Sequence, residues 1–178
     1  MVKKKNKAIF LDRDGVIVSS IIIKKKGFAP KTMKDFKILP KVKIYSNKLK
    51  KKNFKLIIVT NQPDVSKGLI KKSILNKMHK ILKDKCDYDD IYISTSASKK
   101  SFFRKPNPGM LVAAIKKHNL NIKKCYLIGD RESDILAAKK IGCKSIFINR
   151  NYAEKKPTDQ IKTVKSFVEA SKYIIRSI

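Results

Sequence analysis

AIFLDRDGVI, residues 8–17, is the stretch of the sequence that decides the fold. Its apolar run predicts a short buried strand, and Asp12 and Asp14 follow where that strand ends, with Gly15 allowing a tight turn. Two carboxylates this close repel each other unless a cation or a shared proton intervenes, and carboxylate ligands suit Mg²⁺. The alternative is a turn in which Asp is favoured for local hydrogen bonding. The rest of the chain decides between the two.

Beyond this stretch, apolar runs alternate with segments of helical period. The runs predict strands at 55–59, 91–95, 125–128 and 145–148. The helical periods cover 41–53, 69–83, 110–119 and 133–141, and one more lies in the tail between Val164 and Ile175. Nearly continuous apolar strands that alternate with helices are typical of a central parallel sheet covered on both faces, a three-layer α/β sandwich. Because no linker or repeat interrupts the 178 residues, we expect a single domain over residues 1–178.

A short β-branched run near the first predicted strand indicates a small flap. Ile21–Ile23 is followed by lysines and Gly27, with no helical period, which predicts a hairpin or flap within residues 18–29. Each gap between the later strands is filled by one crossover. We therefore expect a minimal cap and a fairly open site.

The net charge of +30 and the pI near 10.1 raise nucleic-acid binding as a candidate function. The basic residues are mostly lysines spread along the whole chain, whereas base-reading proteins favour arginine and interleaved aromatic side chains. We therefore expect attraction for anionic, phosphorylated small molecules and no specific nucleic-acid binding. No apolar run approaches the roughly 20 residues that span a bilayer, and the N-terminus lacks a signal peptide's apolar core, which predicts a cytoplasmic protein with no membrane partner.

Cysteine and histidine give no sign of a disulfide framework or of a metal centre. Cys86, Cys125 and Cys143 are scattered without a paired spacing, and we interpret Cys125 and Cys143 as small buried apolar residues. His79 and His118 lie in helical segments and have no partner at ligand spacing. Both are predicted to be surface or half-buried helix residues.

Distinctive polar groups follow the first four predicted strands. In chain order they are Asp12 and Asp14; Thr60, Asn61 and Gln62; Arg104 and Lys105; and Asp130, Arg131 and Asp134. Functional sites in open parallel sheets gather at the carboxyl ends of the strands, so these groups should lie together. Carboxylates, a hydroxyl and cations suit a phosphoryl group held between a metal and positively charged donors.

Four segments in this order resemble the four motifs of the haloacid dehalogenase superfamily: FLDRDGV, VTNQ, RKPNPGM and GDRESD. The resemblance extends from Lys7 to about Asn149 and implies the Rossmann-like fold of that superfamily. More narrowly, DRDGV with TNQ and RKPxPGM resembles the phosphatases of D-glycero-D-manno-heptose 1,7-bisphosphate and of histidinol phosphate. It implies a Mg²⁺-dependent hydrolase of phosphate monoesters.

The resemblance implies a role for five residues of these motifs. Asp12 would be the nucleophile that forms an aspartyl-phosphate, and Asp14 would be the general acid and then the general base. Thr60 would hydrogen-bond the phosphoryl oxygens, and Lys105 would neutralise charge on the phosphoryl group and on Asp12. Asp130 would hold Mg²⁺ together with Asp12 and the backbone carbonyl of Asp14.

Neighbouring residues of the same motifs are candidates for contact with the substrate. They are Asn61, Gln62, Arg104 and Arg131. A second interpretation of Gln62 is that it only orders its loop. We interpret Asp134 as a residue of a helix's first turn and not as a metal ligand, because acids are favoured there. Lys67 could reach a second phosphate, but we interpret it as a solvated lysine.

The sequence departs from the narrower family at two places. Many members carry a zinc loop, roughly C-x-H then C-x-C, before the RKP motif, but residues 94–103 contain neither Cys nor His, so we expect no structural zinc. Residues 63–65 are Pro-Asp-Val where the heptose enzymes usually have Ser-Gly-Ile. Both departures weaken the assignment of a heptose bisphosphate as the substrate.

Four functions therefore stay open on the sequence alone. The first is a heptose bisphosphate phosphatase of nucleotide-heptose and surface-polysaccharide synthesis, within carbohydrate metabolism. The second is a phosphatase of histidinol phosphate or of another small ester, and the third is a nucleic-acid 3′-phosphatase that uses the basic surface. A non-catalytic binding module is disfavoured because every catalytic position is filled. No oligomeric seam is evident, so a monomer is expected.

Overall fold

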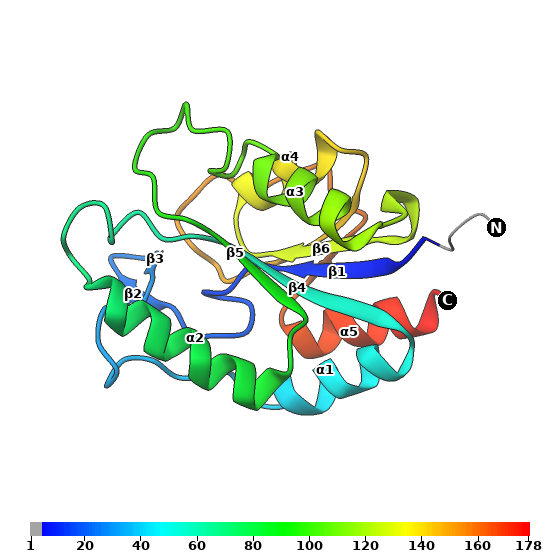
Figure 1. Ribbon diagram of the computed structural model, residues 1–178, viewed down its shortest axis with the longest axis horizontal. Helices are drawn as coiled ribbons and strands as arrows, with labels where there is room; N and C mark the ends of the chain where they lie inside the picture. The colour runs from blue at the N-terminus through cyan, green and yellow to red at the C-terminus, as the bar shows by residue number, and fades with distance from the viewer. Residues whose placement is uncertain (1–4) are drawn as a thin grey trace.

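A parallel sheet forms the centre of the computed structural model, which describes residues 5–178 (Figure 1). Its strands are β1 (Lys7–Leu11), β4 (Phe54–Asn61), β5 (Asp90–Ser94), β6 (Tyr126–Gly129), β7 (Lys144–Ile148) and β8 (Lys162–Val164). They lie in the order β5-β4-β1-β6-β7-β8, and every neighbouring pair is parallel. The predicted α/β fold with a central parallel sheet is confirmed.

The central strand β1 shows why these strands read as unbroken apolar runs. Successive side chains of a strand point to opposite faces, so Ile9 and Leu11 pack into one core while Ala8 and Phe10 pack into the other. All four side chains are buried. Because helices cover both faces of the sheet, the strand carries no polar side chain between Lys7, its partly buried first residue, and Asp12, where it ends.

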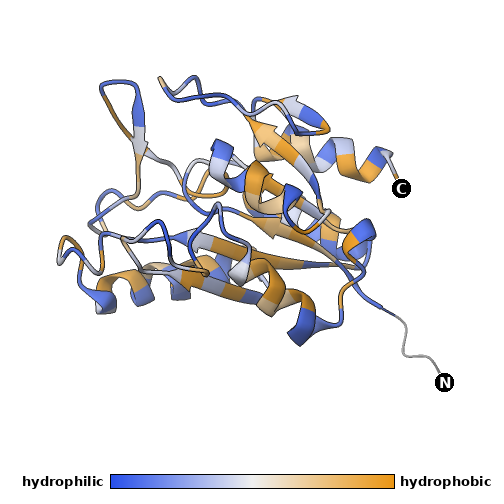
Figure 2. Ribbon diagram, turned by 90° about the horizontal axis from the view of Figure 1, so that it is seen from above, coloured by the Kyte–Doolittle hydropathy of each residue, from blue (hydrophilic) through white to orange (hydrophobic). Residues whose placement is uncertain are grey.

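Helices cover the sheet on both sides (Figure 1). One layer consists of α1 (Val42–Lys51), α2 (Lys72–Cys86) and α5 (Phe167–Arg176), and the other of α3 (Gly109–His118), α4 (Glu132–Lys139) and the short 3₁₀ turn η1 (Ile122–Lys124). Figure 2 shows largely hydrophobic strands inside helices that carry both hydrophilic and hydrophobic residues. This amphipathic pattern buries the apolar stripe of each helix against the sheet. None of the helices within residues 5–178 is long and apolar enough to cross a membrane.

The order of the strands creates one reversal. From β1 the chain adds β4 and then β5 on one side, and it then returns to the other side of β1 to add β6, β7 and β8. The strands β1 and β6 are neighbours, but the connections that follow their carboxyl ends run in opposite directions along the sheet. In open α/β sheets this switch point is the place where ligands bind.

A small hairpin lies at the same end of the sheet as these carboxyl ends (Figure 1). It consists of β2 (Ile21–Ile23) paired antiparallel with β3 (Lys26–Phe28), as predicted for the flap. The flap rests on the loop after β7: a Cβ at Gly27 would lie 2.5 Å from the ring of Tyr152, and Ala153 N donates to Lys25 O at 2.8 Å. Only glycine permits this close approach.

Two elements differ from the sequence expectation by more than two residues. Val164 belongs to β8, a sixth parallel strand, and not to the helical tail, which begins at Phe167. Three residues are too short to display a strand period, and only the pairing of β8 with β7 reveals it. In addition, α2 begins at Lys72, later than predicted, because turns occupy the preceding residues, with Leu69 N bonded to Asp64 O at 2.8 Å.

Candidate active site

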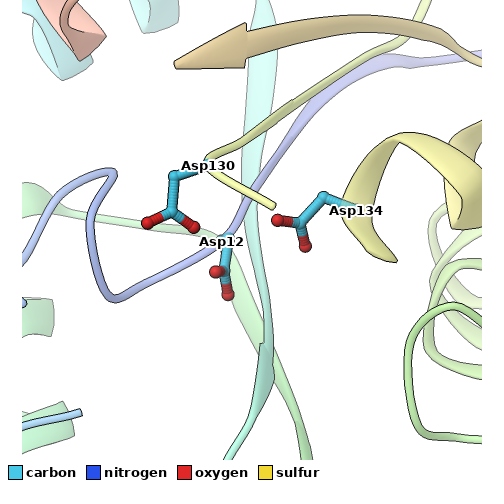
Figure 3. Close-up of side chains that lie close together, drawn as sticks. All are labelled: Asp12, Asp130 and Asp134. Atoms are coloured by element: carbon cyan, nitrogen blue, oxygen red, sulfur yellow. The ribbon is translucent and has the colours of Figure 1, made fainter. Parts of the chain in front are cut away.

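Three carboxylates converge at the switch point of the sheet (Figure 3). Asp12 follows β1, Asp130 follows β6, and Asp134 lies in the first turn of α4. One oxygen of each lies within 4.8 Å of one oxygen of each of the others, and all three residues are buried. The backbone of Asp12 is fixed against the neighbouring strand, because its N–H donates to Ile128 O at 3.0 Å. The first and last acidic motifs of the sequence therefore meet in space.

Gly15 allows the loop after β1 to close over Asp130. Its φ of +78° lies in the left-handed region, and a Cβ at this position would stand 1.8 Å from Oδ2 of Asp130. The guanidinium of Arg150 holds the same turn, with Nε donating to Gly15 O at 2.6 Å. Glycine is thus required at position 15 both by the positive φ of the backbone and by the close approach of Asp130.

We expect Gly15→Ala to displace Asp130 and to lower the phosphatase activity that the motifs predict by about 100-fold, the order of loss that a misplacement of about 1 Å in a site can cause. A titration of the activity with Mg²⁺ should also show weaker binding of the metal. Gly68→Ala is the matched control, since Gly68 has a φ of +70° but no atom within 4 Å of the new Cβ. Equal losses in the two variants would show that backbone strain, and not the clash with Asp130, is responsible.

Lys105 supplies a buried cation to this acidic group. Its Nζ lies 2.8 Å from Asp12 Oδ1 and 2.6 Å from Asp134 Oδ1, and it donates to Val59 O at 2.7 Å. Burial alone would lower the pKa of Lys105, but the charges of Asp12 and Asp134 outweigh it and raise the pKa above its ordinary value. Lys105 therefore stays charged beside the oxygen of Asp12.

Asn61, a predicted substrate contact, holds the backbone of Lys105 in the structure. Its Nδ2 donates to Lys105 O at 3.0 Å, and its Oδ1 accepts from Lys105 N at 3.1 Å. This pair of bonds ties the end of β4 to the loop that carries the lysine. Contact of Asn61 with the substrate stays a prediction.

Asp14 is held by three donors. Arg13 Nε donates to its Oδ1 at 3.0 Å, and Arg13 Nη2 and Gln62 Nε2 donate to its Oδ2 at 2.9 and 2.7 Å. Gln62 also donates to Thr60 Oγ1 at 2.9 Å, so its amide bridges the predicted acid and the predicted phosphoryl ligand. Burial raises the pKa of Asp14, and the charge of Arg13 opposes the rise without cancelling it. A raised pKa favours the protonated form that a general acid requires.

The acidic group fits a divalent cation. Neither carboxylate oxygen of buried Asp130 has a hydrogen-bond partner within the described part of the chain. Burial, followed by the charge of Asp12, raises the pKa of Asp130 well above its ordinary value. Carboxylate oxygens without a hydrogen-bond partner are hard ligands of the kind that Mg²⁺ prefers. Asp134 is engaged elsewhere, since its Oδ2 accepts from Arg131 N at 3.1 Å at the start of α4 and its Oδ1 contacts Lys105.

The two predicted substrate arginines are half-buried and have protein partners. Arg131 Nη1 donates to both oxygens of Glu154 at 2.8 and 2.7 Å, its Nη2 donates to Gly27 O, and its guanidinium lies 5.5 Å from the ring centre of Tyr152. Arg104 Nη1 donates to Ser96 O at 2.7 Å. Substrate contacts by both arginines stay predictions. Arg131 joins the flap to the loop after β7.

Sequence reasoning missed four residues around these groups: Arg13, His79, Tyr152 and Glu154. His79 was expected at the surface or half-buried, which is wrong: it is only 6% exposed, and its Nε2 lies 3.0 Å from Arg13 Nη1. A lone histidine in a helical period carries no local sign of a partner 66 residues away. The position of Arg13 between Asp12 and Asp14 was the available signal for that residue.

His79 should make the stability of the fold depend on pH. Burial and the adjacent charge of Arg13 lower the pKa of His79 to about 3, whereas an unfolded chain titrates near 6.5. Since the unfolded state binds the proton first, this contribution to stability is complete above about pH 6.5 and is lost as the pH falls toward 3. Between pH 7.5 and 5 the wild type should lose about 2 kcal/mol more than His79→Gln in urea unfolding. Parallel losses would contradict a neutral, buried His79.

A doubly wound parallel sheet whose switch point holds acidic groups beside a buried lysine fits the class of protein that the four motifs predict, a hydrolase of the haloacid dehalogenase type. The comparisons with known proteins agree. A family model described as HAD-hydrolase-like matches residues 102–176. A D-glycero-alpha-D-manno-heptose-1,7-bisphosphate 7-phosphatase from Photorhabdus laumondii is 30% identical over 98% of this chain and 100% of its own length.

A second relative has a similar name, and one solved structure has a similar fold. A D-glycero-beta-D-manno-heptose-1,7-bisphosphate 7-phosphatase from Helicobacter pylori is 30% identical over 74% of this chain and 77% of its own. The crystal structure of a D,D-heptose 1,7-bisphosphate phosphatase from B. bronchiseptica, complexed with magnesium and phosphate, superposes with a TM-score of 0.83 at 19% identity over 97% of this chain and 99% of its own. The chain belongs to the haloacid dehalogenase-like phosphatases, hydrolases of phosphoric monoesters. The family predicted from the four motifs is confirmed.

Proposed function

We propose that this protein removes the 7-phosphate of a D-glycero-D-manno-heptose 1,7-bisphosphate through an aspartyl-phosphate on Asp12. The observation that carries the proposed mechanism is the contact of 2.8 Å between Lys105 Nζ and Asp12 Oδ1 next to Asp14 and Asp130. The substrate is proposed from the two sequence relatives named above, both of which are phosphatases of this bisphosphate. Their names differ in the anomer, so the experiment below has to determine whether the α or the β form is the substrate.

In the proposed reaction, a carboxylate oxygen of Asp12 attacks the phosphorus atom and the bond to the sugar oxygen breaks. Asp14 donates its proton to the departing oxygen and afterwards takes a proton from the water that hydrolyses the aspartyl-phosphate. Lys105 and the Thr60 hydroxyl hold the phosphoryl oxygens while negative charge gathers on them. Gln62 keeps Asp14 and Thr60 in register, since its amide donates to both.

The carboxylates of Asp12 and Asp130, with the backbone carbonyl of Asp14, would hold Mg²⁺. The magnesium-binding role is supported by the partnerless oxygens of Asp130, and the cation would reduce the repulsion between a carboxylate nucleophile and a phosphate dianion. Arg104 and Arg131, with Asn61 and Gln62, would contact the remainder of the substrate.

The test is phosphate release with Mg²⁺ and with EDTA on heptose 1,7-bisphosphates of both anomers, histidinol phosphate, simple sugar phosphates and a 3′-phosphorylated oligonucleotide. We expect the highest kcat/KM on a heptose bisphosphate and no activity in EDTA. A preference for another ester would keep the mechanism and reject this substrate. Binding of the oligonucleotide with a steep dependence on salt, together with its hydrolysis, would favour the nucleic-acid function.

We also infer a single-domain, cytoplasmic monomer without structural zinc. The support for the absence of zinc is the loop 94–103, which contains neither Cys nor His. Elemental analysis of the purified protein and light scattering test the metal content and the oligomeric state.

A further inference from the structure

A fully buried guanidinium lies behind the proposed acid. Arg13 has 0% exposure, although it stands between the two aspartates of the opening motif. Its Nε and Nη2 make a two-bond fork on Asp14, at 3.0 and 2.9 Å. A fork of this kind fixes the plane of a carboxylate as well as its distance. The orientation of the Asp14 carboxyl is therefore coupled to the position of the Arg13 guanidinium.

The third nitrogen of the guanidinium is anchored by His79. Arg13 Nη1 lies 3.0 Å from His79 Nε2, and because arginine can only donate, Nε2 must be the acceptor of a neutral imidazole. The lowered pKa of His79 agrees with that neutral state. His79 is itself fixed within α2, where the hydroxyl of buried Tyr88 donates to its backbone oxygen at 3.1 Å. The chain Tyr88–His79–Arg13–Asp14 thus runs from the helical layer to the site.

We propose that His79 and Arg13 are positioning residues that hold the Asp14 carboxyl where its proton reaches the leaving oxygen of the substrate. The role rests on the phosphatase activity proposed above. In that step the bond from Asp12 to phosphorus forms, the bond from phosphorus to the leaving oxygen breaks, and the proton of Asp14 goes to that oxygen. Without His79 the guanidinium keeps its fork but loses the third contact that stops it from rotating.

The alternative is that Arg13 and His79 only stabilise the fold. Substrates with different leaving groups distinguish the two roles. An alkoxide such as a sugar oxygen needs a proton to depart, whereas p-nitrophenolate departs without one. The parameter kcat/KM reports the first irreversible step, the transfer of the phosphoryl group to Asp12, and excludes the later attack of water. A misplaced acid therefore lowers kcat/KM for alkyl phosphates and spares that for p-nitrophenyl phosphate, while a loss of folded protein lowers both equally.

The experiment compares wild type, His79→Phe and His79→Gln on a sugar phosphate, phenyl phosphate and p-nitrophenyl phosphate. We expect His79→Phe, which lacks the acceptor, to lose about 10–100-fold on the sugar phosphate, within the range of general acid catalysis, and less than about 3-fold on p-nitrophenyl phosphate. His79→Gln retains an acceptor oxygen and should recover part of the loss. If His79→Phe does not fold, Arg13→Lys makes the same test, because lysine cannot fork.

Equal losses on all three esters, or no loss on the sugar phosphate, would overturn the positioning role and leave the proposed function intact. Failure of the wild type to hydrolyse any ester in an Asp12-dependent manner would overturn both. The two failures are therefore distinguishable in one set of measurements.

Discussion

Asp12→Asn is expected to abolish turnover, with a fall in kcat of at least about 10⁴-fold, the order seen when the nucleophile of a covalent mechanism is removed. An amide of the same shape keeps the position of the side chain but cannot form the aspartyl-phosphate. The side chain is buried, and its nearest cation is Lys105 at 2.8 Å, so the substitution removes a charge without changing volume. A hydroxylamine-sensitive phosphoenzyme, trapped by rapid acid quench, should form in the wild type and be missing in the variant.

Asp84→Asn is the matched control, since Asp84 is exposed on α2 and the substitution changes the same charge. It should retain full activity. Turnover by Asp12→Asn close to that of the wild type, or a phosphoenzyme that persists in it, would move the nucleophile to another residue. The remaining candidates at the switch point are Asp130 and Asp134.

The central sheet and the meeting of the acids could be predicted because both follow from local pattern and one rule of topology. The part of a strand that is buried on both faces has to be apolar, so the apolar run of β1 after Lys7 shows in the sequence that the strand ends before Asp12. The carboxyl ends of parallel strands share one edge, so Asp12 and Asp130 were expected together although 118 residues separate them. The boundaries of the elements then differ from expectation by only a few residues.

The partners of polar side chains could not be predicted, because they depend on distances that no local period encodes. The sequence places Asn61 in a site motif, but its bonds to the backbone of Lys105 need the fold. Likewise, the helical spacing predicts that His79 lies on a helix, but its contact with Arg13 depends on how that helix packs in the fold. The short strand β8 is a third case, because its three residues are defined by their pairing with β7.

Lys105→Met should lower kcat by about 10³-fold, near the upper end of the loss when one preorganised donor to a developing charge is removed. The apolar side chain has a similar length, so the pocket stays filled. The loss of the ammonium leaves Asp12 and Asp134 without their shared cation, which makes the site more negative. Binding of Mg²⁺ should therefore be no weaker in the variant, and a titration of metal by calorimetry checks this.

This separation of kcat from metal affinity distinguishes Lys105 from Gly15, whose replacement should weaken the binding of the metal itself. Lys67→Met is the control for the loss of one positive charge, because Lys67 is exposed and this highly basic chain has many other lysines. It should leave both quantities unchanged. If Lys105→Met lost metal affinity and kcat in parallel, the lysine would act by shaping the acidic group and not by neutralising the phosphoryl group. The negative charge on the phosphoryl group would then be stabilised by the cation and by a hydrogen bond from the Thr60 hydroxyl.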